Sequence, residues 1–331
     1  MPELLQEYLF HRIREKLRPT DSLVDVVASL LFVSNDSAYR RIRGETGLVL
    51  EEARILCDHF HLSLDELLGS KPNTISFSYK RLENGTYDFE QYLFDIKTNL
   101  QMAAGGEIIY LTKDIPVFYN FLFRPLFAFR YFFWMKSILQ HPDFVNQKFS
   151  FSFLPPEMEK TGSEIVSLYN QISSVEIWNT ECVNSTISQV EYYREAGYFQ
   201  SEEDIHTIYS SVADLLEHLR RQADCGSKFI PGEKVSVKKE NLHFFYNRLV
   251  LGENTIIVKK QGKAILYLAY DVLNYMVTLD ESFVSDTLQK VNNLMRRSTL
   301  LSSANEKQRN IFFNLLLRKI PDSGNYIKSQ A

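Results

Sequence analysis

The chain has 331 residues, enough for two or three domains, and its 45% hydrophobic and 24% charged content is ordinary for a folded globular protein. The formal net charge of −4 excludes binding to nucleic acid through overall charge, so any such binding needs a local basic patch. Residues 1–17 lack a signal-peptide pattern, and Arg124, Pro125 and Arg130 interrupt the most apolar window, residues 115–135. We therefore expect a cytoplasmic protein without a membrane segment.

Cysteine, histidine and carboxylate residues form no recognisable cofactor site. Cys57, Cys182 and Cys225 are widely spaced, which is typical of buried free thiols in a reducing compartment. His59 and His61 stand two positions apart at a predicted helix end and point in different directions, which disfavours a metal site. The sequence contains no Walker loop, GxSxG or HExxH motif. We expect no cofactor, no metal ion and no enzymatic activity.

The first 70 residues show the apolar spacing of short helices. One helix is expected over residues 3–18, and Asp21 can cap the next. A fourth helix carries the apolar positions of residues 53–60. The sequence SLDE at 63–66 is a capping box that opens a short fifth helix. Together these segments predict a compact all-helical domain over residues 1–70.

Residues 26–44 predict two short helices joined by a tight turn, the second and third of this domain. Ala38 and Ile42 form the buried face of the later helix, and the Ser34 hydroxyl can cap its start. The remaining positions turn polar side chains outward, namely Asn35, Asp36, Ser37, Tyr39, Arg40, Arg41 and Arg43. A short helix with such a face is suited to the major groove of DNA. The alternative is a solvated helix face in a protein-interaction module.

Within the DNA reading, the outward side chains divide by chemistry. Asparagine can bond to adenine and arginine to guanine, so the candidates for base edges are Asn35, Ser37 and Arg40. The candidates for phosphate contacts, which set the register without reading sequence, are Tyr39, Arg41 and Arg43. Asp36 either accepts a hydrogen bond from the amino group of cytosine or interacts favourably with the positive end of the helix dipole. Ser34, the helix cap, is the remaining predicted site residue.

Residues 23–69 resemble the five-helix DNA-binding domain of lambda-repressor-like regulators of the xenobiotic-response-element (XRE) type. The resemblance rests on VVASLLFVSNDSAYRRIRG at 26–44 and LEEARILCDHFHLSLDELLG at 50–69. It implies a bacterial helix-turn-helix transcription regulator that binds double-stranded DNA as a homodimer. Two positions depart from the pattern: Phe32 stands where the family usually has a turn glycine, and Val49 where it has a capping Ser or Thr.

The charge of the helical domain also favours a dimer. Through Lys71, nine basic residues stand against twelve acidic ones, a net charge of −3. One such domain is poorly suited to tight binding alone, although three arginines crowd one helix end. A dimer that places two such domains on paired half-sites would bind DNA more tightly than one domain does.

A turn-rich break at residues 70–74 precedes a region, 75–331, that we expect to be mixed α and β and to sense a signal or dimerise. The segment at 226–234 is a candidate for a further boundary. The overall fold class expected is mainly α with an α+β C-terminal part. Its expected helices cover 88–102, 126–139, a segment opened by a capping box at 161–164, 185–196, 202–221, 281–297 and 306–318, the last with a capping box at 303–306. Residues 75–79 are expected to form an edge strand or a linker that pairs with another segment. The other expected strands are one at 107–112 and three antiparallel strands at 242–246, 255–259 and 264–270.

The aromatic run from Phe118 to Trp134 allows two interpretations. It either lines a ligand pocket or dimer interface, or it is ordinary core, which is the commoner case. Arg124 and Arg130 within it either bind an anionic effector or pair with nearby carboxylates. The leading hypothesis is a sequence-specific transcriptional regulator with an unidentified small-molecule or protein effector. The alternatives are a protein-interaction adaptor whose activity lies in the C-terminal region, and an enzyme fused to a regulator domain.

Overall fold

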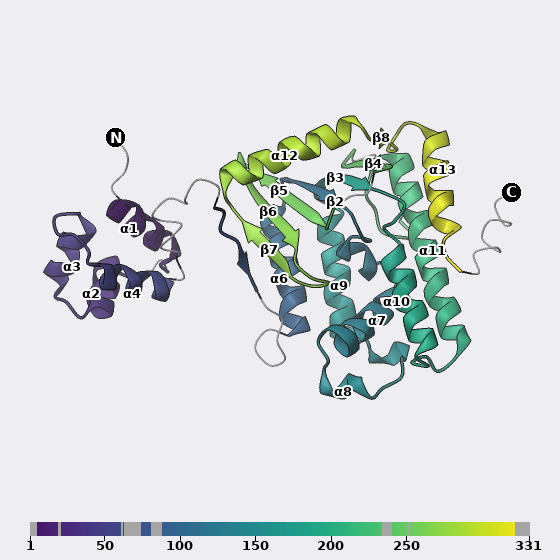
Figure 1. The fold of residues 1–331 in the computed structure, drawn as a ribbon, viewed down its shortest axis with the longest axis horizontal. Coiled ribbons are helices and arrows are strands. Elements are labelled where there is room, and N and C mark those ends of the chain that lie inside the picture. Colours follow the sequence, from purple (N-terminus) through teal and green to yellow (C-terminus); the bar gives the residue numbers. More distant parts are fainter. Residues whose placement is uncertain are drawn as a thin grey trace. The chain divides into compact units, whose positions relative to one another are not determined.

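The computed structural model describes residues 5–18, 21–60, 62, 74–80, 88–233, 240–249 and 252–321. The chain divides into two compact units, Met1–Ser76 and Phe77–Ala331, each with its own hydrophobic core (Figure 1). The expected fifth helix at 63–69 lies outside the described residues.

The first unit contains helices α1 (Leu5–Lys16), α2 (Leu23–Leu31), α3 (Asn35–Ile42) and α4 (Leu50–Phe60), so the four helices expected in this range are confirmed. Their apolar faces meet in one core, with residues such as Ile13, Val27, Ala38 and Leu56 excluded from solvent. The cap predicted for α2 is wrong by one residue. Ser22, not Asp21, caps the helix by accepting the Asp25 backbone N–H at 3.4 Å.

The second unit is built on an eight-stranded mixed sheet with the strand order β1-β7-β6-β5-β2-β3-β4-β8. The strands are β1 (Ser78–Tyr79), β2 (Glu107–Leu111), β3 (Ser173–Trp178), β4 (Leu242–Tyr246), β5 (Thr255–Lys260), β6 (Lys263–Ala269), β7 (Tyr275–Thr278) and β8 (Thr299–Leu300). Strands β2, β3 and β4 run parallel, and the other pairings are antiparallel.

This sheet corrects part of the predicted topology. The strands expected near 255–259 and 264–270 do pair antiparallel, as β5 and β6, and residues 78–79 do form an edge strand. The strand at 242–246 does not join them as a third antiparallel member, because β4 pairs with β3 in parallel. The protein is therefore mixed α/β, and residues on both sides of 226–234 belong to one sheet.

The two faces of the sheet carry unequal helical layers (Figure 1). The described helices of this unit are α6 (Phe89–Ala103), α7 (Arg124–Phe133, continued by a π turn Trp134–Ile138), α8 (Pro142–Val145), α9 (Pro156–Tyr169), α10 (Asn184–Glu195), α11 (Glu202–Cys225), α12 (Glu281–Arg296) and α13 (Glu306–Leu317), with 3-10 turns at Val117–Phe121 and Phe151–Phe153. Strand residues alternate between the faces, so Ile108 and Tyr110 enter the larger core while Ile109 packs with residues of α12.

Two expected capping boxes are absent, although α13 begins at Glu306 as expected. Residues 161–164 are not a capping box, because α9 already begins at Pro156 and the Thr161 hydroxyl donates back to the Glu157 carbonyl. At α13 the N-cap is Asn305, which has a left-handed backbone (φ 55°) and no side-chain capping bond, so residues 303–306 form no capping box. Across the described ranges, no helix is both long and apolar enough to cross a membrane.

Candidate nucleic-acid interface

Helix α3 presents a polar face to solvent and a small apolar face to the core. Ser34 caps it as expected, its hydroxyl accepting the Ser37 backbone N–H at 3.3 Å. Ala38 is fully buried, which anchors the helix on α2. The predicted outward residues that are exposed are Ser34, Asn35, Asp36, Tyr39, Arg40 and Arg43, whereas Ser37 and Arg41 are half-buried. Six of the eight predicted site residues therefore lie on an accessible surface.

Arg41 is held inside the first unit by Glu52 of α4. Its Nε and Nη2 donate to the two carboxylate oxygens at 3.0 and 2.8 Å, and Nη1 donates to the Ser37 carbonyl at 3.2 Å. The hydrogen bond from Arg41 lowers the pKa of the Glu52 carboxyl and raises that of the guanidinium. A bidentate pair of this kind orients α3 on α4 and occupies the donors that a phosphate would need.

Arg40 and Arg43 are the exposed arginines of this surface. Both lie near Glu45, with closest N···O distances of 4.0 and 3.5 Å, and the Arg43 guanidinium lies 5.6 Å from the Tyr39 ring centroid. More than half of each arginine side chain is exposed. Because exposed ion pairs at such distances are weak, both guanidinium groups can exchange Glu45 for a phosphate or a base edge.

Asn35 begins the helix in a defined orientation. Its Nδ2 donates to Asp25 Oδ1 of α2 at 2.8 Å. This bond lies at the N-terminal end of α3. It links the two helices on either side of the turn.

The turn between α2 and α3 has the geometry that makes glycine usual there. Phe32 has φ 54° and ψ 42°, the left-handed conformation, and its side chain is 94% exposed. The ring gains no packing in return for this strained backbone. Phe32 therefore occupies a left-handed position of the kind that favours glycine.

Gln6 of α1 is a structural residue that sequence reasoning missed. Its Nε2 donates to the carbonyls of Arg41 and Thr46 at 2.7 and 2.8 Å, and its Oε1 accepts the Leu48 N–H at 2.9 Å. These bonds satisfy backbone groups of the segment between α3 and α4. Nothing in the helical periodicity marks such a contact over 42 positions.

In the second unit, the aromatic run from Phe118 to Trp134 is core. Its phenylalanine, tyrosine and tryptophan side chains are largely buried and belong to the main hydrophobic cluster. Arg124 pairs with Glu159 at 3.2 Å. Arg130 is buried, and its guanidinium donates to the side-chain oxygens of Asn120, Thr186 and Gln189 rather than to a carboxylate. Burial lowers the pKa of Arg130 to about 10.

A second buried polar group surrounds Glu176 of β3. Its carboxylate accepts hydrogen bonds from Tyr119 and Tyr169 at 2.6 Å each and from Trp178 Nε1 at 2.9 Å. Lys228 is also sealed from solvent, with its Nζ 3.8 Å from the Tyr169 ring centroid and no hydrogen-bond partner in the described structure. Burial lowers the pKa of this ammonium to about 7.

These buried groups were not predicted, since an isolated Glu or Lys in the sequence gives no sign of burial. Among the described residues, no group of three or more His, Cys, Asp or Glu is placed to hold a metal ion. A scan against protein-family models finds no match. A search of curated proteins finds none either.

Proposed function

We propose that this protein is a sequence-specific DNA-binding transcriptional regulator of the lambda-repressor-like, XRE type, acting in the cytoplasm as a homodimer. The observation that carries the proposal is helix α3: capped by Ser34, fixed to the core by Ala38, and exposed along its polar face. A helix used for DNA recognition needs this combination of rigid support and a free face. The second unit then serves dimerisation or signal sensing.

The geometry supports a division of roles on α3. Asn35 and Arg40 are exposed and chemically suited to base edges, Asn35 at the start of the helix. Tyr39 and Arg43 stack on one another and suit the phosphate backbone. Arg41, predicted as a phosphate contact, is better assigned to support, because Glu52 takes its donors.

This assignment predicts a modest salt dependence. If Arg43 of each protomer neutralises a phosphate, a dimer releases counterions from about two charges, giving a log–log salt slope of roughly −1.8. If Arg41 also leaves Glu52 and neutralises a phosphate, the slope would steepen to roughly −3.6. The slope thus reports whether Arg41 leaves Glu52 on binding.

The test uses the full chain and duplexes selected by it from a random-sequence library, with affinity measured by fluorescence anisotropy at several salt concentrations. The double variant Arg40→Ala, Arg43→Ala should lose binding at moderate salt. Arg54→Ala removes an exposed arginine of α4 and serves as the control for charge. Asn35→Ala should weaken the selected site by about 5- to 150-fold, equivalent to 1–3 kcal/mol, and affect random DNA little. Failure to select any duplex would overturn the proposal.

One observation favours a second candidate, a protein-interaction adaptor. The first unit exposes apolar side chains, with Phe32 94%, Leu50 70% and Val49 56% accessible. Such residues are used in protein contacts. Phe32→Asn, which keeps a left-handed conformation accessible, separates the two functions. DNA affinity should be unchanged by this variant under the first proposal, whereas an adaptor should lose its partner in a pull-down.

A further inference from the structure

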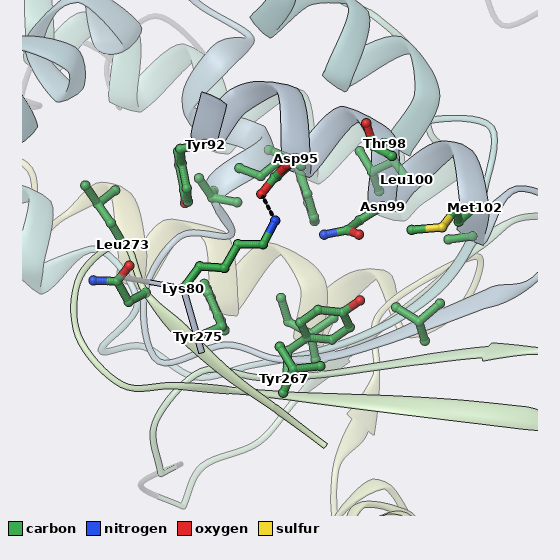
Figure 2. A pocket seen from close by; sticks show the side chains of 18 of the residues that line it. Lys80, Tyr92, Asp95, Thr98, Asn99, Leu100, Met102, Tyr267, Leu273 and Tyr275 are labelled. Atoms are coloured by element: carbon green, nitrogen blue, oxygen red, sulfur yellow. Dashed lines mark hydrogen bonds and ion pairs between the residues drawn. The ribbon is translucent and has the colours of Figure 1, made fainter. Parts of the chain in front are cut away.

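The second unit contains a cleft of about 530 Å³ between helix α6 and the antiparallel half of the sheet (Figure 2). Ile96 and Leu100 line it from α6, and Ile256, Val258 and Val277 line it from β5 and β7. Clefts that hold small molecules have volumes of about 300–1,000 Å³ and mainly apolar walls. The size and lining of this cleft therefore fit a small organic ligand.

The charged groups of the cleft compensate one another. Lys80, which follows β1, and Asp95 of α6 are the charged members of its described lining, and they bond at 2.6 Å. Figure 2 shows this pair linking the two walls. A charged ligand would lose hydration in the cleft and find no uncompensated opposite charge there. The lining consequently favours a neutral occupant.

Two polar groups face each other across the same space. Figure 2 shows Tyr267 rising from the sheet and Asn99 extending from α6 on the opposite side. Within the described part of the chain, neither the Tyr267 hydroxyl nor the Asn99 amide bonds to another residue. Each can therefore bind a polar group on a ligand.

Exposed apolar and aromatic side chains lie beside the polar groups at the opening of the cleft. Met102 and Tyr79 both belong to the lining and are 59% and 58% exposed. Tyr79 also lies near Tyr270, itself 64% exposed, with ring centroids 5.8 Å apart. Exposed apolar side chains gathered around a cleft mark a binding site more often than isolated ones do.

We infer that this cleft binds a neutral, mainly apolar small molecule that hydrogen-bonds to Tyr267 and Asn99. The inference deepens the sensing role in the proposed function, but its geometry belongs to the second unit alone. Binding would bury the apolar body between α6 and the sheet and satisfy the two facing polar groups.

A matched pair of dyes tests the ligand class on the full chain without DNA. N-phenyl-1-naphthylamine is neutral and carries one N–H donor, whereas 8-anilino-1-naphthalenesulfonate has the same skeleton with an added sulfonate. The neutral dye should bind with a micromolar Kd, seen as increased fluorescence. The sulfonate should bind at least about tenfold more weakly, the equivalent of 1.4 kcal/mol. Equal or tighter binding of the sulfonate, or no binding of the neutral dye, would overturn the inference.

Variants locate the bound dye. Val258→Phe and Val277→Phe each place a larger side chain in the cleft and should weaken binding of the neutral dye at least about tenfold. Tyr267→Phe should weaken it by about 2- to 12-fold, the equivalent of one hydrogen bond. Val145→Phe, at a 46% exposed position of α8 outside the lining, should have no effect.

Circular dichroism establishes that each variant is folded. If Val258→Phe does not fold, Val277→Phe and Tyr267→Phe still decide the result. Unchanged dye affinity in the folded cleft variants would overturn the inference by placing the dye elsewhere. Because no DNA is present, that failure would leave the proposed role of α3 untouched, and loss of DNA binding in the α3 variants would leave dye binding untouched.

Discussion

Lys228→Met should change how the stability of the second unit depends on pH. Lys228 is 1% exposed, its Nζ has no hydrogen-bond partner among the described residues, and burial lowers its pKa from 10.5 to about 7. In the unfolded chain the lysine regains an ordinary pKa. Between these two values the unfolded state binds more protons than the folded state, so stability rises with pH. Methionine has similar length and no charge, and it removes this dependence.

The magnitude follows from proton linkage. With a folded pKa near 7, the difference in bound protons is about one half at pH 7 and close to one at pH 9. At 1.36 kcal/mol per proton and pH unit, the free energy of unfolding of the wild type should rise by about 2 kcal/mol relative to Lys228→Met over this interval. Below pH 7 the full cost of burying the charge is present in the wild type.

Urea denaturation at pH 7, 8 and 9 measures this difference. Both tryptophans, Trp134 and Trp178, are buried in the second unit, so their fluorescence reports its unfolding. Lys148→Met, at an exposed position, is the control and should follow the wild type at every pH. Parallel pH profiles for the wild type and Lys228→Met would refute the reasoning, because they would mean that the lysine is charged and solvated in both states.

Three further predictions concern stability. Phe32→Gly should raise the free energy of unfolding of the first unit by about 1 kcal/mol, because glycine adopts the left-handed turn without strain and the exposed ring packs on nothing. Denaturation followed by helical circular dichroism measures this change. A lower free energy of unfolding in the variant would contradict the prediction. Glu52→Gln should lower the stability of the same unit by about 1–2 kcal/mol at pH 7, because it weakens the bond to Arg41. The carboxylate's contribution is present above its unfolded pKa of 4.5 and is lost as the pH falls through the lowered folded value, so the two proteins should converge in acid. Gly162→Ala should destabilise the second unit by about 1–3 kcal/mol in tryptophan-monitored denaturation, because a Cβ there would lie 2.7 Å from a ring carbon of Phe127, and unchanged stability would show that the ring can move aside.

Local patterns predicted the helices of the first unit well. The spacing of apolar residues located α1 to α4, and the hydroxyl of Ser34 marked the start of α3. The same pattern identified which side chains of α3 turn outward, apart from the half-buried Ser37 and Arg41. The partner of Arg41, Glu52, lies eleven positions away on another helix. The spacing of residues within one helix does not predict a contact between two helices.

The sheet was harder to predict because its key pairings are distant and one strand is unusual. Strand β3, SSVEIW, carries Ser174 and Glu176 toward the interior, so the alternation of apolar and polar residues that identifies a strand is masked. Without β3, nothing indicated that β4 had a parallel neighbour. At α9, the sequence suggested Thr161 as a cap. The helix begins five residues earlier, at Pro156, so the Thr161 hydroxyl instead donates to a backbone carbonyl within the helix.

Strand β1 gives the cleft a connection to the rest of the chain. It is paired with β7 at two positions only, it lies next in sequence to the helical unit, and its residues Ser78 and Tyr79 also line the cleft. A molecule held in the cleft would therefore contact Ser78 and Tyr79, which follow directly in sequence on the last residue of the first unit, Ser76, and on Phe77.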